Sequence, residues 1–214
     1  MLTVDRFSCH GWRPGLIADS AALMSREYAF RFGVGVQYEA WVTTELAAFL
    51  TAFDAARCEW WTVNRAGQLV GCAAIDGRVG DGDRAEFRWF CLAEVCRGRG
   101  VGRRVLAEAV AWAAQRRLRC LQLHTHLDLS AAVHLYEQAG FVRAEARPGP
   151  AWAPHLEFQL YQLTIANEAT GPAGAASASV RGARAECGLH GSPKPHLPSR
   201  PQHPQRDRRS FANA

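Results

Sequence analysis

The spacing of apolar residues predicts two helices near the start of the chain. From Ile17 to Phe32 and from Tyr38 to Phe53, apolar residues recur every three or four positions, which is the period of an amphipathic helix. Asp19 or Ser20 is the expected N-terminal cap of the first helix. Glycines follow Phe32 directly and separate the two helices, because glycine commonly ends a helix.

Shorter apolar runs bounded by Gly, Pro, Asn or Asp predict strands in much of the remaining globular part. The segments from Asn64 to Gln68 and from Gly80 to Asp83 are expected to form turns. The elements expected are strand Phe7 to Trp12, helices Ile17 to Phe32 and Tyr38 to Phe53, strands Cys58 to Val63, Leu69 to Ile75 and Ala85 to Ala93, helix Arg103 to Arg116, strand Cys120 to Thr125, helix Ser130 to Ala139, and strands Phe141 to Ala144 and Leu156 to Leu163. This order predicts an α+β layer architecture rather than a doubly wound one.

The C-terminal part of the sequence has a different composition. Residues 167–214 contain little besides Gly, Pro, Ala, Ser, Arg and His, and Phe211 is their one aromatic residue. They hold seven Arg or Lys against three Asp or Glu, so about +4 of the chain's net charge of +5 lies there. Such a segment cannot bury a core. We expect one domain over residues 1–166 and a disordered, basic Pro/Arg-rich tail over 167–214, acting as a solvated linker or contacting nucleic acid or an acidic surface.

Composition also narrows the class of protein. No run of residues approaches the apolar length of a membrane span, and the first residues lack the basic and then apolar pattern of a signal peptide. The seven cysteines are odd in number and include no Cys-x-x-Cys pair, which favours reduced thiols. We therefore expect a cytoplasmic protein, and no metal site, because His and Cys do not occur at ligand spacing.

A glycine-rich segment between a predicted strand and a predicted helix is the strongest candidate for chemistry. It is Arg97-Gly98-Arg99-Gly100-Val101-Gly102, and the helix follows from Arg103. Such a loop leaves unpaired N–H groups at a helix N-terminus, where the helix dipole favours an anion. Glycine permits positive φ and close approach of a ligand, and the arginines add charged donors. The segment therefore predicts a phosphate-binding loop.

Two other nucleotide-binding loops fit this segment less well. A P-loop ends in Gly-Lys-Ser/Thr, whereas Gly102 is followed by Arg103 and the chain's one lysine is Lys194. The dinucleotide motif Gly-x-Gly-x-x-Gly needs its third glycine one position later than Gly102, and an acidic residue at the end of the next strand. Asp128 lies just beyond that strand and keeps the dinucleotide interpretation as an alternative.

The loop resembles the acetyl-CoA loop of the GNAT superfamily of N-acetyltransferases, which has the pattern Arg/Gln-x-x-Gly-x-Gly/Ala. A second segment, AVHLYEQAGF at residues 132–141, is similar to the superfamily's Ala-x-x-Leu-Tyr-x-x-x-Gly-Phe. The likeness spans about Trp12 to Leu163. It implies a mixed, mostly antiparallel sheet flanked by helices, with a splayed central strand pair, and acetyl-CoA as co-substrate. The acceptor would enter near Phe32 to Val36.

The resemblance implies how the coenzyme is held. The backbone of the strand that enters the loop would bind the pantetheine amides and the thioester carbonyl, and the loop would bind the pyrophosphate. His126 stands where relatives often have an asparagine that holds the coenzyme. The implied coenzyme-binding residues are Cys91, Leu92, Ala93, Arg97, Gly98, Arg99, Gly100, Val101, Gly102, Arg103, His126 and Ala132.

Acetyl transfer to an amine also needs a neutral amine and a proton for the departing thiolate. Tyr136 occupies the position at which GNAT enzymes commonly place a general acid. Glu86 matches a position at which several relatives carry a glutamate base, although a surface salt bridge with Arg88 explains it equally well. His124 and His126 are alternative bases, because imidazole titrates near neutral pH.

Some features depart from the superfamily's pattern. Glu94 stands where many relatives have proline, and Leu129 replaces an asparagine that contacts pantetheine. The closest likeness is to the acetyltransferase domain that is fused to MarR-type DNA-binding regulators, from Arg13 through the segment Arg26-Glu27-Tyr28 to Leu163. We expect a stand-alone version without the DNA-binding module.

The expected function is acetyl-CoA-dependent transfer of an acetyl group to a primary amine, directly in a ternary complex. The acceptor is a small molecule or a protein amine, and Trp41, Tyr38 and Arg31 would suit a small aromatic or acidic amine. We expect no specific nucleic acid and no membrane partner, and homodimerisation stays open. The alternative is a non-catalytic acyl-CoA-binding regulatory module.

Overall fold

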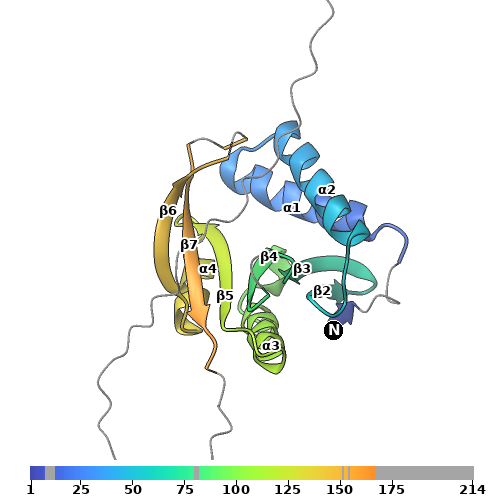
Figure 1. Cartoon of the computed structure of the whole chain (residues 1–214). Coiled ribbons are helices and arrows are strands. Elements are labelled where there is room, and N and C mark those ends of the chain that lie inside the picture. Colours follow the sequence, from blue (N-terminus) through green and yellow to red (C-terminus); the bar gives the residue numbers. More distant parts are fainter. Residues whose placement is uncertain (8–12, 80–81, 151, 154, 167–214) are drawn as a thin grey trace, which may run out of the picture.

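The computed structural model describes residues 1–7, 13–79, 82–150, 152–153 and 155–166. In these ranges, a seven-stranded sheet carries helices on both faces (Figure 1). The elements are β1 (Leu2–Phe7), α1 (Leu16–Phe32), α2 (Val36–Thr51), β2 (Cys58–Arg65), β3 (Gln68–Asp76), β4 (Arg84–Leu92), the short 3-10 helix η1 (Glu94–Cys96), α3 (Val101–Gln115), β5 (Cys120–His126), α4 (Ser130–Gln138), β6 (Val142–Pro148) and β7 (Glu157–Thr164).

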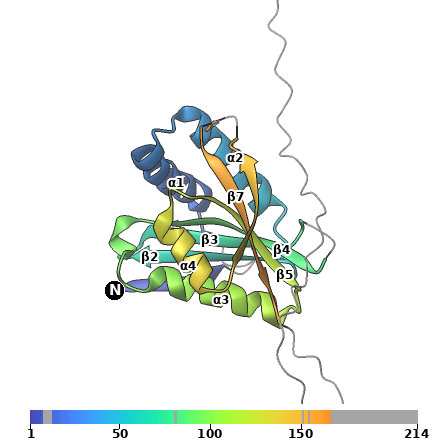
Figure 2. The same cartoon turned by 90° about the vertical axis from the view of Figure 1, so that its left-hand side faces the viewer.

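The sheet is mixed, as predicted. Its strand order is β1-β2-β3-β4-β5-β7-β6, in which β4 and β5 pair in parallel and every other pair is antiparallel. Alternating side chains along each strand divide the core in two. Trp60 and Ala74 pack with α1 and α2, whereas Trp61 and Ala73 pack with α3. The two helical layers lie on opposite sides of the sheet (Figure 2).

The first strand is earlier in the chain than predicted. β1 covers Leu2–Phe7 and pairs antiparallel with β2, and residues 8–12 of the predicted strand lie outside the described residues. Leu2 and Val4 pack against the α3-side core, which accounts for the alternation of apolar and polar residues at the start of the chain. The predicted strand began at Phe7 and did not include the alternating residues from Leu2 onward.

Two helix starts also differ from the predictions. Gly15, with φ +87°, precedes α1, so Asp19 lies in its first turn, where its carboxylate pairs with Arg13 at 2.8 Å. The residue before α4 is Leu129, and Ser130 is already helical. No side chain caps either helix among the described residues. A glycine in the left-handed conformation redirects the chain into α1 without a cap residue.

An irregularity in β4 shapes the centre of the sheet. Cys72 lies opposite Cys91 and Ala74 lies opposite Arg88, so two residues of β4 face one residue of β3. Trp89, within this β-bulge, has φ +51°, which non-glycine residues rarely adopt. A bulge bends its strand and increases its twist. The bend occurs immediately before β4 delivers the chain to the glycine-rich loop.

The domain boundary at residue 166 stays a prediction, because residues 167–214 lie outside the described residues. We expect a chain truncated after Ala166 to keep the melting temperature and the acetyl-CoA affinity of the full chain, since a segment of that composition adds little to a core. Differential scanning calorimetry and titration calorimetry measure both quantities. A marked loss of either would place part of the tail within the folded unit.

Among the helices in the described ranges, none combines the length and apolar character needed to cross a bilayer.

Candidate active site

The two central strands separate before either of them ends. The parallel pairing of β4 with β5 runs from Arg84 opposite Cys120 to Glu86 opposite Gln122. β4 then continues to Leu92 and β5 to His126 without further pairing to each other. The bulge bends β4 in this region. The predicted splay is confirmed, and it leaves one edge of β4 free of a strand neighbour among the described residues.

Alternation along β4 decides which backbone groups face that edge. The amide of Ala93 donates a hydrogen bond of 2.8 Å to the carbonyl of Val70 in β3. Backbone groups of alternate residues point the same way, so those of Cys91 also face β3 and those of Leu92 face the opening toward β5. Of the three residues predicted to bind pantetheine through their backbone, Leu92 is therefore the one with the suitable orientation.

The glycine-rich loop has the backbone that its sequence predicts. Gly98 and Gly100 have φ of +66° and +70°, and no atom lies within 4 Å of where a Cβ would stand on either residue. Gly100 immediately precedes α3, whose first turn carries no acidic residue. Gly102 is different, because it lies inside α3 and a Cβ there would be 3.3 Å from Leu135. Close helix packing accounts for this third glycine.

The side chains of the loop leave its outer surface positively charged. Arg97, Arg99 and Arg103 are exposed, and Arg97 pairs with Glu94 at 3.3 Å. In the part of the chain that the structure describes, the side chains of Arg99 and Arg103 make neither a hydrogen bond nor an ion pair. The Val101 side chain is buried, so this residue can offer a ligand only its backbone. Open space, helix N–H groups and two unpaired guanidinium groups fit a pyrophosphate.

Replacing Gly100 by Ala tests the loop. We expect a loss of about 1–2 kcal/mol of folding free energy, because an L-residue is strained in the left-handed conformation. The matched control is Gly67→Ala in the β2–β3 turn, where φ is +80° and the space is equally open. Both variants should lose similar stability in urea unfolding. Only Gly100→Ala should also weaken acetyl-CoA binding, and equal affinities would show that the loop does not touch the coenzyme.

Tyr136 lies on α4 and is buried against the rings of Phe90 and Phe141, at centroid distances of 6.2 and 5.9 Å. Burial raises the pKa of Tyr136 far above its usual value, and the nearby Tyr28 and Cys91 raise it further. Those two residues belong to the α1 side of the sheet. The pKa of Tyr136, a residue of the α3 and α4 side, is therefore affected by residues on the opposite face of the sheet.

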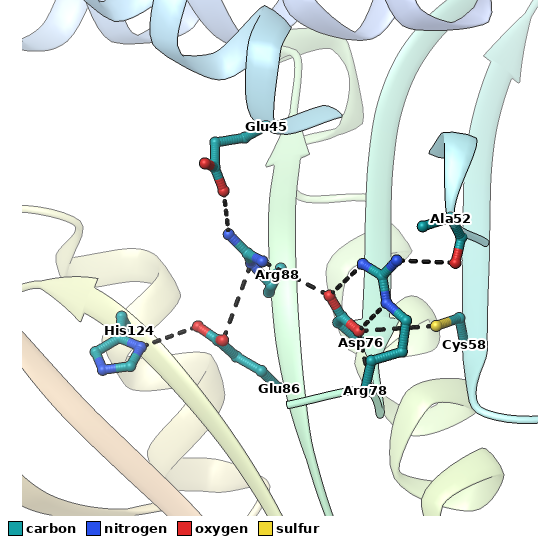
Figure 3. Close-up of polar contacts among 8 residues, drawn as sticks. All are labelled: Glu45, Ala52, Cys58, Asp76, Arg78, Glu86, Arg88 and His124. Atoms are coloured by element: carbon teal, nitrogen blue, oxygen red, sulfur yellow. Dashed lines mark hydrogen bonds and ion pairs between the residues drawn. The ribbon is translucent and has the colours of Figure 1, made fainter. Parts of the chain in front are cut away.

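Glu86 and His124 form a hydrogen-bonded pair across β4 and β5. Nδ1 of His124 is 3.0 Å from Oε1 of Glu86 (Figure 3). The two side chains are only 16% and 22% exposed. Burial alone would raise the pKa of Glu86, but the hydrogen bond from His124 and the positive charge of Arg88 outweigh it, so this pKa is lowered. Glu86 is therefore a carboxylate at neutral pH.

A carboxylate at Nδ1 determines what the imidazole can do. It accepts the Nδ1–H, which favours the neutral tautomer whose Nε2 carries a lone pair. The geometry thus makes His124 Nε2 the better base and Glu86 the group that orients it. The ion pair of Glu86 with Arg88, one of the two alternatives considered from the sequence, is present at 4.0 Å. The other alternative, Glu86 as the base, stays a prediction.

His126 has a different environment from His124. It is 1% exposed, its ring lies 4.3 Å from that of Phe32, and neither ring nitrogen has a partner within the described ranges. Burial lowers its pKa, although Asp128 opposes this, so the ring is neutral. Its carbonyl accepts the amide of Leu129 at 3.1 Å. The coenzyme contacts expected of His126 and of the half-buried Ala132 stay predictions.

The residues expected near the acceptor divide into two groups. Tyr38 is buried and stacks on Tyr28 at 4.8 Å, and Arg31 pairs with Glu27 at 3.2 Å along α1. Both are thus occupied by contacts within the fold. Trp41 is only partly buried and lies 5.1 Å from Trp152. Tyr38 is thus closed to an acceptor, whereas the exposed Arg31 and the partly buried Trp41 keep some surface for one.

Two acidic residues near the pair were not singled out from the sequence. Glu45 of α2 and the buried Asp76 of β3 both form ion pairs with Arg88. The sequence could have indicated Asp76, because it is a charged residue directly after an apolar predicted strand. For Glu45 the sequence offers no indication beyond its place in a predicted helix. In the described ranges, these residues included, no group of three His, Cys, Asp or Glu side chains is arranged to hold a metal ion.

Solved structures share this fold. An acetyltransferase from Streptococcus agalactiae aligns with a TM-score of 0.62 at 14% identity, over 77% of this chain and 98% of that one. Ribosomal-protein-S18-alanine N-acetyltransferase from Escherichia coli gives 0.56 at 19% identity, over 79% and 98%. Spermidine N-acetyltransferase from Vibrio cholerae, in complex with CoA and spermine, gives 0.57 at 18% identity, over 77% and 95%. At these identities the likeness concerns the fold.

The sequence gives independent support for a family. None of the curated proteins matches this chain. A family model described as the acetyltransferase (GNAT) family matches residues 23–141, more than half of the sequence. The matched range contains the separated strands, the glycine-rich loop, the His124–Glu86 pair and Tyr136. This chain therefore belongs to the acetyltransferase (GNAT) family.

Proposed function

We propose that this protein transfers the acetyl group of acetyl-CoA to a primary amine, directly within a ternary complex. The observation that carries the proposal is the His124–Glu86 pair, which lies where β4 and β5 separate. A base at this point is what acetylation of an amine requires, because only the neutral amine is a nucleophile. Membership of the acetyltransferase family supports the type of reaction.

Acetyl-CoA would supply an activated acetyl group. The N-terminus of α3, Arg99 and Arg103 would hold its pyrophosphate, and the backbone of Leu92 would hold the pantetheine arm. We assign the general base to His124 and the orienting role to Glu86. Tyr136 keeps its proton at neutral pH and would donate it to the leaving thiolate.

The acceptor is proposed as an amine of a small molecule or of a protein. It would approach from the side of α1 and α2, which His124 and Glu86 face, past Trp41. A cytoplasmic location, a homodimer and the absence of nucleic-acid and membrane partners stay predictions. The kinship to the acetyltransferase domain of MarR-type fusions, without their DNA binding, also stays a proposal that rests on the segments around Arg13 and Arg26.

Two measurements on the full chain test this function. Titration calorimetry with acetyl-CoA measures binding, and release of free thiol over a panel of amines measures turnover. We expect both binding and amine-dependent thiol release, with mass spectrometry detecting the N-acetylated amine. Binding without turnover over the whole panel would favour the non-catalytic acyl-CoA-binding module. Absence of binding would contradict both functions.

A further inference from the structure

Arg88 lies at the centre of a group of three carboxylates. Its Nη2 is 3.0 Å from Oε2 of Glu45, its Nη1 is 3.7 Å from Oδ2 of Asp76, and its Nε is 4.0 Å from Oε2 of Glu86 (Figure 3). The guanidinium also stacks over the ring of Trp89 at 4.2 Å. The bulge that places Arg88 and Trp89 together thus fixes a cation beside Glu86.

The three carboxylates do not depend on Arg88 to the same degree. Both oxygens of Asp76 already accept hydrogen bonds from Arg78, at 2.8 and 2.9 Å, and Cys58 contacts the same carboxylate. Burial alone would raise the pKa of Asp76, but the bonds from Arg78 and the nearby Arg88 lower it. Arg78 thus anchors Asp76, and the charge of Arg88 acts mainly between Glu45 and Glu86.

We infer that Arg88 is a positioning residue that holds Glu86 as a carboxylate directed at Nδ1 of His124. Its positive charge partly offsets the negative charge of Glu86, which would otherwise stabilise imidazolium. Glu45 on α2 in turn offsets part of the charge of Arg88. Charges of alternating sign thus run from Glu45 on α2 through Arg88 to Glu86, which contacts His124. The kinetic consequence of this inference rests on the proposed function.

The charged groups that face the pair come from several elements. Besides Glu86 and Arg88 on β4, they are Glu45 from α2, Asp76 from β3 and Arg78, which follows β3. On β5 itself, His126 is buried and neutral. The signs of two substitutions follow. Removing Arg88 exposes His124 to more negative charge, which favours imidazolium, and removing Glu45 leaves Arg88 less neutralised, which disfavours it.

An NMR titration of the His124 ring in the full chain tests this inference without substrate. The Cε1–Hε1 signal is assigned by its loss in His124→Gln. We expect Arg88→Gln to move the titration midpoint of His124 upward, and Glu45→Gln to move it downward, each by about 0.5–1 pH unit. Arg104→Gln, which removes an exposed ion pair on α3, should leave it unchanged. Unchanged midpoints in both variants, or shifts in the same direction, would overturn the inference.

Two further variants separate charge from folding. Arg88→Lys keeps the charge, so its midpoint should lie nearer to that of the wild type than the midpoint of Arg88→Gln does. If Arg88→Gln does not fold, Glu45→Gln still tests the inference, because Glu45 is half-buried on a helix surface and its replacement should be tolerated. In that variant the titration midpoint of His124 must fall. Circular dichroism of each variant reports whether the fold is kept.

The same variants give a kinetic readout. The acidic limb of the kcat/KM profile reports the base of the free enzyme, so it should move as the NMR midpoint does. Moved NMR midpoints in a protein that acetylates no amine would contradict the proposed function and leave the role of Arg88 intact. If the variants acetylate amines but neither the His124 titration midpoint nor the acidic limb of the kcat/KM profile moves, only the role of Arg88 is contradicted.

Discussion

Replacing His124 by Gln is expected to lower kcat/KM for the amine by about 10²–10⁴-fold at neutral pH, the usual contribution of a general base. In the proposed reaction the imidazole Nε2 removes the proton from the attacking amine, and glutamine has no comparable basicity. The loss should shrink as the pH rises, because more of the acceptor is then already neutral. Initial rates of thiol release from pH 6 to 10 measure this dependence.

Glu86→Gln distinguishes orientation from proton removal. The amide oxygen of glutamine can still accept the Nδ1–H of His124, so the ring stays in place, but the negative charge is lost. We expect a smaller decrease in kcat/KM than for His124→Gln, since the base itself remains. A larger decrease for Glu86→Gln would make Glu86 the direct base.

A control on α4 guards against general effects of losing a histidine. His134 is exposed, and within the described residues its ring has one polar contact, with the side-chain amide of Gln138 at 2.9 Å. His134→Gln should keep the wild-type rate. If His124→Gln retained more than half of the wild-type kcat/KM at neutral pH, the assignment of the base would be wrong.

Local signals predicted most of the fold, and its deviations have local physical causes. The helix predicted from Arg103 begins at Val101, because Gly100 turns the chain and Gly102, although a poor helix former, fits against Leu135. The strand predicted for Phe141 to Ala144 extends over Val142–Pro148. β6 is an edge strand, where charged residues and proline are tolerated, so its second half gave no apolar signal.

The candidate site was predictable to the extent that its parts are local. The glycine-rich loop and Tyr136 lie within short segments whose spacing carries their role. Glu86 and Arg88 are two residues apart on a strand, which places both on one face. The contact of Glu86 with His124 depends on the parallel register of β4 and β5, which pairs Glu86 with Gln122. A register between strands separated by a helix cannot be derived from either strand alone.

The bulge at Trp89 is the other feature that the sequence did not indicate. Regular alternation would place Arg88 on the same face as Phe90, yet Phe90 packs on the α3 side and Arg88 pairs with Glu45 of α2. The left-handed conformation of Trp89 reverses the alternation at this point. A tryptophan gives no hint of such a conformation, because bulky residues rarely adopt it.

Tyr136→Phe should lower kcat by about ten-fold or more, toward the range of a general acid's contribution, and leave the acetyl-CoA affinity nearly unchanged. A phenylalanine ring preserves the packing on Phe90 and Phe141, so the substitution removes only the hydroxyl. Tenfold corresponds to about 1.4 kcal/mol of transition-state stabilisation. Steady-state kinetics with titration calorimetry on the same preparation measure both quantities.

The pKa of Tyr136 gives this prediction a second test. Because burial raises that pKa far above the ordinary value, the phenol stays protonated where an exposed tyrosine already ionises, near pH 10. The wild-type kcat should therefore show no decline from loss of this proton as the pH approaches that value. Tyr161→Phe is the matched control, because Tyr161 is also buried and its hydroxyl contacts Glu137 at 3.4 Å. A kcat of Tyr136→Phe within two-fold of the Tyr161→Phe value would mean that the departing thiolate takes its proton from water, and Tyr136 would then serve only to fill the core beside β4.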